Sequence, residues 1–80
     1  MNTREAVALR FQRLCEKNNI SLNRLANISA VPPSSLKNVL YGRSQNPGIV
    51  TIKKLCDGLE ITLGEFFSTE EFDNLEQEIE

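Results

Sequence analysis

The chain has 80 residues, 40% of them apolar and 25% charged, a composition that indicates one small globular domain and argues against disorder or a disulfide scaffold. Its net charge of −2 is unevenly distributed, because all nine Lys and Arg residues occur up to Lys54 against two acids, whereas the remainder holds nine acids and no base. A part carrying +7 therefore precedes a part carrying −9, so the acidic total does not exclude a nucleic-acid partner.

The first predicted helix runs from about Thr3 to Lys17. Asn2 followed by Glu5 resembles a capping box, and apolar residues recur at the spacing of one helix face: Val7, Phe11, Leu14 and Cys15. Because Cys15 and Cys56 both fall on apolar faces, we interpret them as buried thiols of a protein in the reducing cytoplasm. A redox pair or a metal site is the less favoured alternative. With two Cys and no His, we expect no metal site and no cofactor.

Two short amphipathic helices follow and share one core. Ser21 is placed as the N-cap of a helix that ends near Ser29, and a second helix is expected from Pro33 to Gly42. Each has apolar residues at i, i+3 and i+4: Leu22, Leu25 and Ala26 in the first, and Leu36, Val39 and Leu40 in the second. This spacing, with a tight break between the helices, predicts a helix-turn-helix.

The other face of the second helix carries a polar stripe at i, i+3, i+4 and i+7: Ser34, Lys37, Asn38 and Tyr41. A stripe of this kind is commonly a solvated helix face. On the second helix of a helix-turn-helix it favours contact with base edges or phosphates in a major groove, most strongly for Lys37 and Asn38.

The rest of the chain predicts three more helices and no strand. Residues Arg43 to Gly48 form a loop, and the next helix presents Ile52, Leu55, Cys56 and Leu59. A short fifth helix begins at Thr62 with Glu65 as its capping partner and presents Leu63, Phe66 and Phe67. We expect a domain over 1–69 and an acidic helix or tail over 70–80. The apolar edge of that helix is formed by Phe72, Leu75 and Ile79.

From about Val7 to Phe67 the order of residues resembles the Cro and lambda-repressor-like family, also called the xenobiotic-response-element family. The matching positions are Ser21, Leu25, Ala26, Val31, Ser35, Leu36, Val39, Gly42, Pro47, Thr51, Leu55, Leu59 and Phe66. The resemblance implies an all-α, compact five-helix repressor-like DNA-binding domain, here followed by the short acidic helix. It further implies a homodimer on a two-fold symmetric operator, with the second helix of the motif as the recognition helix.

Three positions depart from the family pattern. Leu22 stands where members often have a phosphate-binding Gln, so the nearest phosphate donors become Ser21, Asn23 and Arg24. Ala30 stands at the turn where Gly is usual, which costs about 1 kcal/mol if the backbone there has positive φ. Pro32 and Pro33 begin the recognition helix. Pro33 is expected to press on a thymine methyl, and the polar contacts then pass to Ser34, Ser35, Lys37 and Asn38.

The function predicted from these features is sequence-specific duplex DNA binding by a small transcriptional regulator, most simply a repressor. The resemblance makes Arg43 a backbone-phosphate contact, although an ordinary polar loop is an equal alternative. An enzyme is not expected, because catalytic motifs are absent from the sequence. The main alternative is an antitoxin or anti-repressor whose acidic helix binds a basic partner protein. Otherwise we expect the apolar edge of that helix to pack on a second copy, with packing on Phe66 and Phe67 of its own chain as the alternative.

Overall fold

The computed structural model describes residues 1–41 and 46–79, and within these ranges all regular structure is helical. The bounds of the six helices are α1 Thr3–Lys17, α2 Leu22–Ser29, α3 Pro33–Leu40, α4 Ile49–Gly58, α5 Leu63–Phe67 and α6 Glu70–Asp73. The predicted all-α fold is thus confirmed. Three predicted caps are also present, since the side chains of Asn2, Ser21 and Thr62 each accept a hydrogen bond from a backbone N–H three residues ahead.

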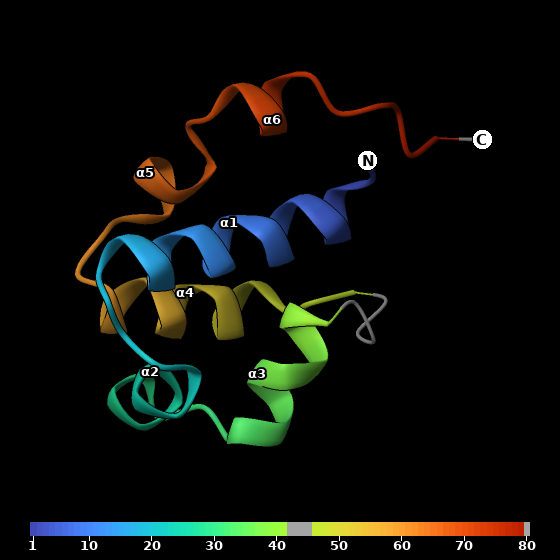
Figure 1. The fold of residues 1–80 in the computed structure, drawn as a ribbon. Helices are drawn as coiled ribbons and strands as arrows, with labels where there is room; N and C mark the ends of the chain where they lie inside the picture. Colours follow the sequence, from blue (N-terminus) through green and yellow to red (C-terminus); the bar gives the residue numbers. More distant parts are fainter. Residues whose placement is uncertain (42–45, 80) are drawn as a thin grey trace.

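The helices are arranged so that α1 and α4 separate α2 and α3 from α5 and α6 (Figure 1). α3 packs on α1 and α2, α2 also packs on α4, and the short α5 and α6 pack on α4 and α1 respectively. The largest fully buried side chains are Phe11, Leu25, Leu36, Leu55, Cys56 and Phe66. Because these residues come from all of α1 to α5, one core holds the helix-turn-helix against the rest of the domain.

Three helix ends use the same turn, and none uses glycine. Asn19, Ala30 and Glu60 have φ values of 51°, 55° and 59°, in the left-handed region. After each, the next backbone N–H bonds to a carbonyl five residues earlier, as in the bond from Val31 N to the Ala26 carbonyl of 3.0 Å. The positive φ anticipated at Ala30 is confirmed, and the turn between α2 and α3 is formed despite the strain of a Cβ there.

We therefore expect Ala30→Gly to raise the free energy of unfolding by up to about 1 kcal/mol, because glycine relieves the left-handed strain. The greater entropy of glycine in the unfolded chain offsets part of this gain. Glu60→Gly should act similarly, whereas Asn19→Gly should gain less, because asparagine tolerates this conformation. Urea denaturation of the three variants measures the differences. A loss of stability at Ala30→Gly, whose side chain is exposed, would contradict the strain argument.

The acidic C-terminal segment is only partly helical. An acidic helix or tail was expected over 70–80; α6 ends at Asp73, so the helix is shorter than the apolar spacing of the segment predicted, and residues 75–79 are not helical. Unpaired carboxylates near a helix C-terminus oppose the helix dipole, and isolated short helices are marginal in water. Phe72, Leu75 and Ile79 therefore do not share one helical edge: Phe72 lies against Phe67, with ring centroids 4.9 Å apart, Leu75 is half-buried, and Ile79 is 85% exposed.

Two polar contacts also hold the acidic segment to α1. The Arg13 guanidinium donates to the Glu71 carboxylate at 2.6 Å, and the Thr3 backbone N–H donates to the Glu78 carboxylate at 3.0 Å. The Thr3 N–H holds the pKa of Glu78 below its ordinary value, and the pKa of Glu71 is lowered by its own backbone N–H and by Arg13. The segment therefore follows α1 on the side opposite α3 (Figure 1).

Candidate nucleic-acid interface

The second helix of the motif presents the predicted stripe to solvent. Leu36, Val39 and Leu40 are at most 4% exposed, and they anchor one face of α3 in the core. Ser34, Lys37, Asn38 and Tyr41 are exposed. Tyr41 follows the last helical residue as the C-cap and is 60% exposed. The eight residues of α3 thus separate into a buried apolar face and an exposed face that offers hydroxyl, ammonium and amide groups.

The beginning of α3 is apolar and lacks a side-chain cap. Pro32 is the N-cap residue and Pro33 the first helical residue, where the missing N–H of proline costs no helical hydrogen bond. Pro33 is exposed, as a contact to a thymine methyl requires, whereas Ser35 is half-buried and presents less of its side chain than Ser34. The helix ends at Leu40 rather than at Gly42, which lies outside the described residues.

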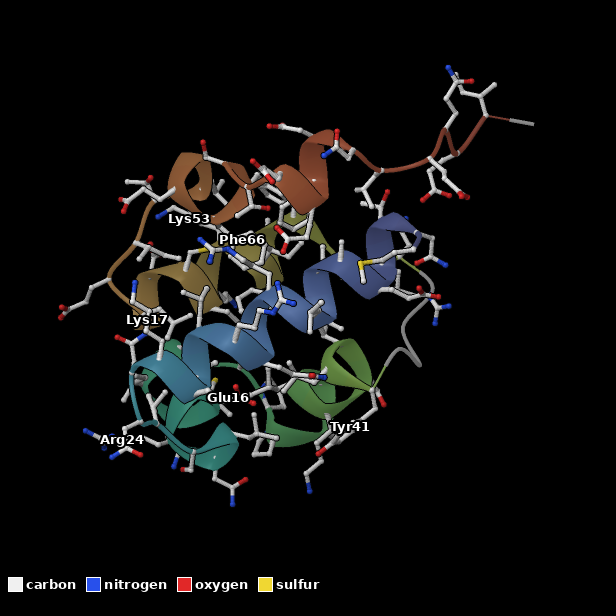
Figure 2. All side chains as sticks on the ribbon, turned by 45° about the horizontal axis from the view of Figure 1, so that its top comes forward. Glu16, Lys17, Arg24, Tyr41, Lys53 and Phe66 are labelled. Atoms are coloured by element: carbon white, nitrogen blue, oxygen red, sulfur yellow. The ribbon has the colours of Figure 1, made fainter. Side chains whose placement is uncertain are left out.

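The N-terminus of α2 offers a second group of polar residues. The Ser21 hydroxyl oxygen accepts a hydrogen bond of 3.1 Å from the Arg24 backbone N–H, so the hydroxyl proton stays available to a phosphate. Asn23 and Arg24 are exposed. Arg24 and Tyr41 both extend outward from the helix-turn-helix in Figure 2, while Lys53 lies at the other side of the molecule. Arg43, predicted as a phosphate contact, lies outside the described residues.

Two of the described basic residues, Arg10 and Arg13, bind groups on α5 and α6 rather than joining the helix-turn-helix surface. Arg10 points toward α5, where its Nε and Nη2 donate to the Phe66 and Glu65 carbonyls at 2.9 and 3.0 Å. Arg13 pairs with Glu71, as described above. These two guanidinium groups therefore lie on the side of α1 that faces α5 and α6. On the described helix-turn-helix itself, the basic side chains are those of Arg24 and Lys37.

A shallow groove lies beside this surface, with a volume of about 680 Å³. It is lined by residues of α1, of the turn before α2, of the start of α2 and of the end of α3: Gln12, Cys15, Glu16, Asn19, Ile20, Ser21, Leu22, Leu40 and Tyr41. The groove thus joins the N-terminus of α2 to the end of α3. Cys15 is only 5% exposed, and burial raises the pKa of its thiol, which keeps the thiol protonated and poorly reactive.

Sequence reasoning did not identify Gln12 as part of this region. Its side-chain Nε2 donates to the Leu40 carbonyl at 2.9 Å, between α1 and the last residue of α3. Gln12 lies on the first helix, next to the apolar Phe11, and nothing in its sequence context distinguishes it from a solvated polar residue. Only the packing of α3 on α1 brings the two groups together.

Comparisons with known proteins agree with this geometry. The family model described as "Cro/C1-type HTH DNA-binding domain" matches residues 10–71. Among solved structures, the chain is similar to the one titled "Crystal structure of the prophage Lp1 protein 11", with a TM-score of 0.81 and 30% sequence identity. That match covers 94% of this chain and 100% of the other. A comparison with curated proteins found none that matches. In the described part of the chain, no helix has the length and apolar character needed to cross a membrane.

Proposed function

This chain belongs to the family of Cro/C1-type helix-turn-helix DNA-binding domains, and from that premise we propose that it is a cytoplasmic transcriptional regulator, a repressor, that binds specific duplex sites through α3. The observation that carries the proposal is the exposed Lys37 and Asn38 pair on a helix whose opposite face is buried. A helix of this shape enters a major groove, where lysine donates to guanine and an asparagine amide pairs with adenine.

The phosphate contacts are assigned to the N-terminus of α2 and to the ends of α3. Ser21, Asn23 and Arg24 offer donors beside the positive end of the α2 dipole, which favours an anion. Ser34, Ser35 and Tyr41 flank the base-reading pair along α3, and Pro33 supplies an apolar contact. We also assign a phosphate contact to Arg43, which follows α3 in the sequence.

We further propose that two copies bind a two-fold symmetric operator, because an eight-residue recognition helix reads only a few base pairs. The interface need not use Phe72, which packs within its own chain on Phe66 and Phe67. The same packing weakens the alternative of a basic protein partner bound by an acidic helix, because the apolar edge of that helix is partly occupied. Among the described residues, the exposed carboxylates of Glu70, Asp73 and Glu76 and the exposed Ile79 still support it.

Selection of bound fragments from the source genome tests this function. The full chain should enrich a short site with two-fold symmetry, and the mass of the complex should correspond to two chains per duplex. Binding should weaken with salt, because each neutralised phosphate releases condensed counterions. Absence of any enriched site at low salt would reject the proposal. Enrichment of a site without symmetry, bound by a single chain, would retain DNA binding and reject the dimer.

The positions of the arginines lead to a matched prediction. Arg24→Ala should weaken binding to all duplexes alike and reduce the slope of log affinity against log salt by about 1 per chain. Arg13→Ala removes the same charge on the side that faces α6, and it should leave that slope unchanged. Titrations of both variants over a range of salt concentrations measure the difference. Equal effects of the two substitutions would show that the helix-turn-helix side is not the DNA-binding side.

A further inference from the structure

The two ends of α3, the proposed recognition helix, differ in their side-chain hydrogen bonds. At its start, Pro32 offers no side-chain cap, and the residues that precede it form the strained turn at Ala30. At its end, the Leu40 carbonyl is one of the helix-terminal acceptors that have no partner within a helix. That carbonyl receives the Gln12 amide at 2.9 Å. A side chain of α1 therefore holds the end of α3 that carries Tyr41.

We propose that Gln12 is a positioning residue for sequence recognition: it fixes the rotation and axial position of α3 through the Leu40 carbonyl without contacting a base. This inference rests on the proposed function. The core contacts of Leu36, Val39 and Leu40 are apolar and non-directional. They strongly oppose removal of α3 from the core but only weakly oppose a small rotation of α3 about its axis. A hydrogen bond to a terminal carbonyl is directional and resists that rotation.

The geometry also explains why this role falls to a glutamine. The residue is half-buried on α1 and lines the groove beside α3, so its side chain can reach across to the end of α3. A neutral amide donates to the carbonyl at little desolvation cost, whereas a lysine or arginine would also attract phosphates nonspecifically. The bond aligns Lys37 and Asn38 because both lie within one turn of Leu40 on the same short helix.

The test compares Gln12→Leu with Gln77→Leu, the same change at an exposed position of the C-terminal segment. In NMR spectra of the full chain, Gln12→Leu should move the Leu40 carbonyl carbon resonance upfield as the hydrogen bond is lost. Its affinity for the fragment selected by the wild type should fall about two- to tenfold, the range that one net hydrogen bond supplies. Affinity for a scrambled duplex of equal length should not change, and Gln77→Leu should behave as wild type in each measurement.

Each other outcome is decisive. Unchanged specific affinity despite the shifted Leu40 resonance would overturn the proposal while leaving the DNA-binding function standing. An equal loss on both duplexes would overturn it too, because Gln12 would then contact the DNA backbone directly. If the wild type itself lacks specific binding, the proposed function fails, and the positioning role fails with it. Should Gln12→Leu not fold, Gln12→Met removes the donor with a more flexible chain, and the same readouts apply.

Discussion

Substituting Lys37 or Asn38 by alanine should reduce the preference for the specific site. Each change removes donors from the exposed face of α3 and leaves the buried face of Leu36, Val39 and Leu40 intact, so both variants should fold normally. A good contact to a base edge contributes about 1 to 3 kcal/mol of discrimination. The expected loss of specific affinity is therefore about 5- to 150-fold for each variant.

The two variants should differ in their response to salt. Asn38→Ala removes no charge, so its salt slope and its affinity for a scrambled duplex should equal those of the wild type. Lys37→Ala removes one positive charge and should weaken scrambled duplexes slightly, but its larger effect should be on the specific site. Titrations of the specific and the scrambled duplex give the ratio of specific to nonspecific affinity for each variant.

Asn74→Ala and Lys53→Ala provide matched controls, because Asn74 follows α6 and Lys53 lies away from Arg24 and Tyr41 (Figure 2). Both should preserve the ratio of specific to nonspecific affinity. If Lys37→Ala and Asn38→Ala also preserve it while folded, α3 does not read the sequence.

Gly58→Ala should cost about 1 to 3 kcal/mol of unfolding free energy. Gly58 ends α4 where it crosses α2, and a Cβ built there would lie 2.0 Å from Ser29 Oγ and 3.3 Å from Ile28 Cγ1. Alanine favours a helix by about 1 kcal/mol over glycine, but this gain is smaller than the expected cost of the overlap. Ser29 is only 5% exposed, so its side chain has little room to move aside.

Ser29→Ala should relieve part of that cost and should itself be neutral or stabilising. The buried Ser29 hydroxyl has no hydrogen-bond partner among the described residues, so its removal loses no bond. In a double-mutant cycle we expect Gly58→Ala to be less harmful on the Ser29→Ala background, with a coupling of about 1 kcal/mol. The relief should be incomplete, because the remaining Ser29 Cβ would still lie 3.2 Å from the new methyl group.

Gly64→Ala is the control for the glycine substitution, since its nearest contact would be Thr62 Oγ1 at an ordinary 3.8 Å. It should leave stability unchanged or raise it slightly. Urea denaturation of all the variants measures these differences. A Gly58→Ala variant as stable as the wild type would show that α2 and α4 can move apart freely, contrary to the close packing seen here.

Local sequence determined most of the helices. The caps at Asn2, Ser21 and Thr62 were predicted from short-range patterns, because the bond from each cap to a backbone N–H spans three residues. The division of α3 into a buried face and an exposed stripe followed from helical periodicity alone. Such features depend on neighbours within one or two turns, so they can be recognised without knowledge of the packing.

Tertiary structure decided the features that depend on a distant partner. Charge counting suggested one basic surface, but Arg10 and Arg13 bind groups on α5 and α6. The apolar spacing of the acidic segment predicted a longer helix. In the structure, Phe72 packs on Phe67 of α5, and helix α6 ends one residue after Phe72. Uncompensated carboxylates near the helix C-terminus disfavour its continuation. Gln12 meets a carbonyl 28 residues away in sequence. The sequence around a polar helix residue is the same whether water or a distant backbone group is its hydrogen-bond partner. Only the packing of α3 on α1 shows that Gln12 binds a backbone carbonyl.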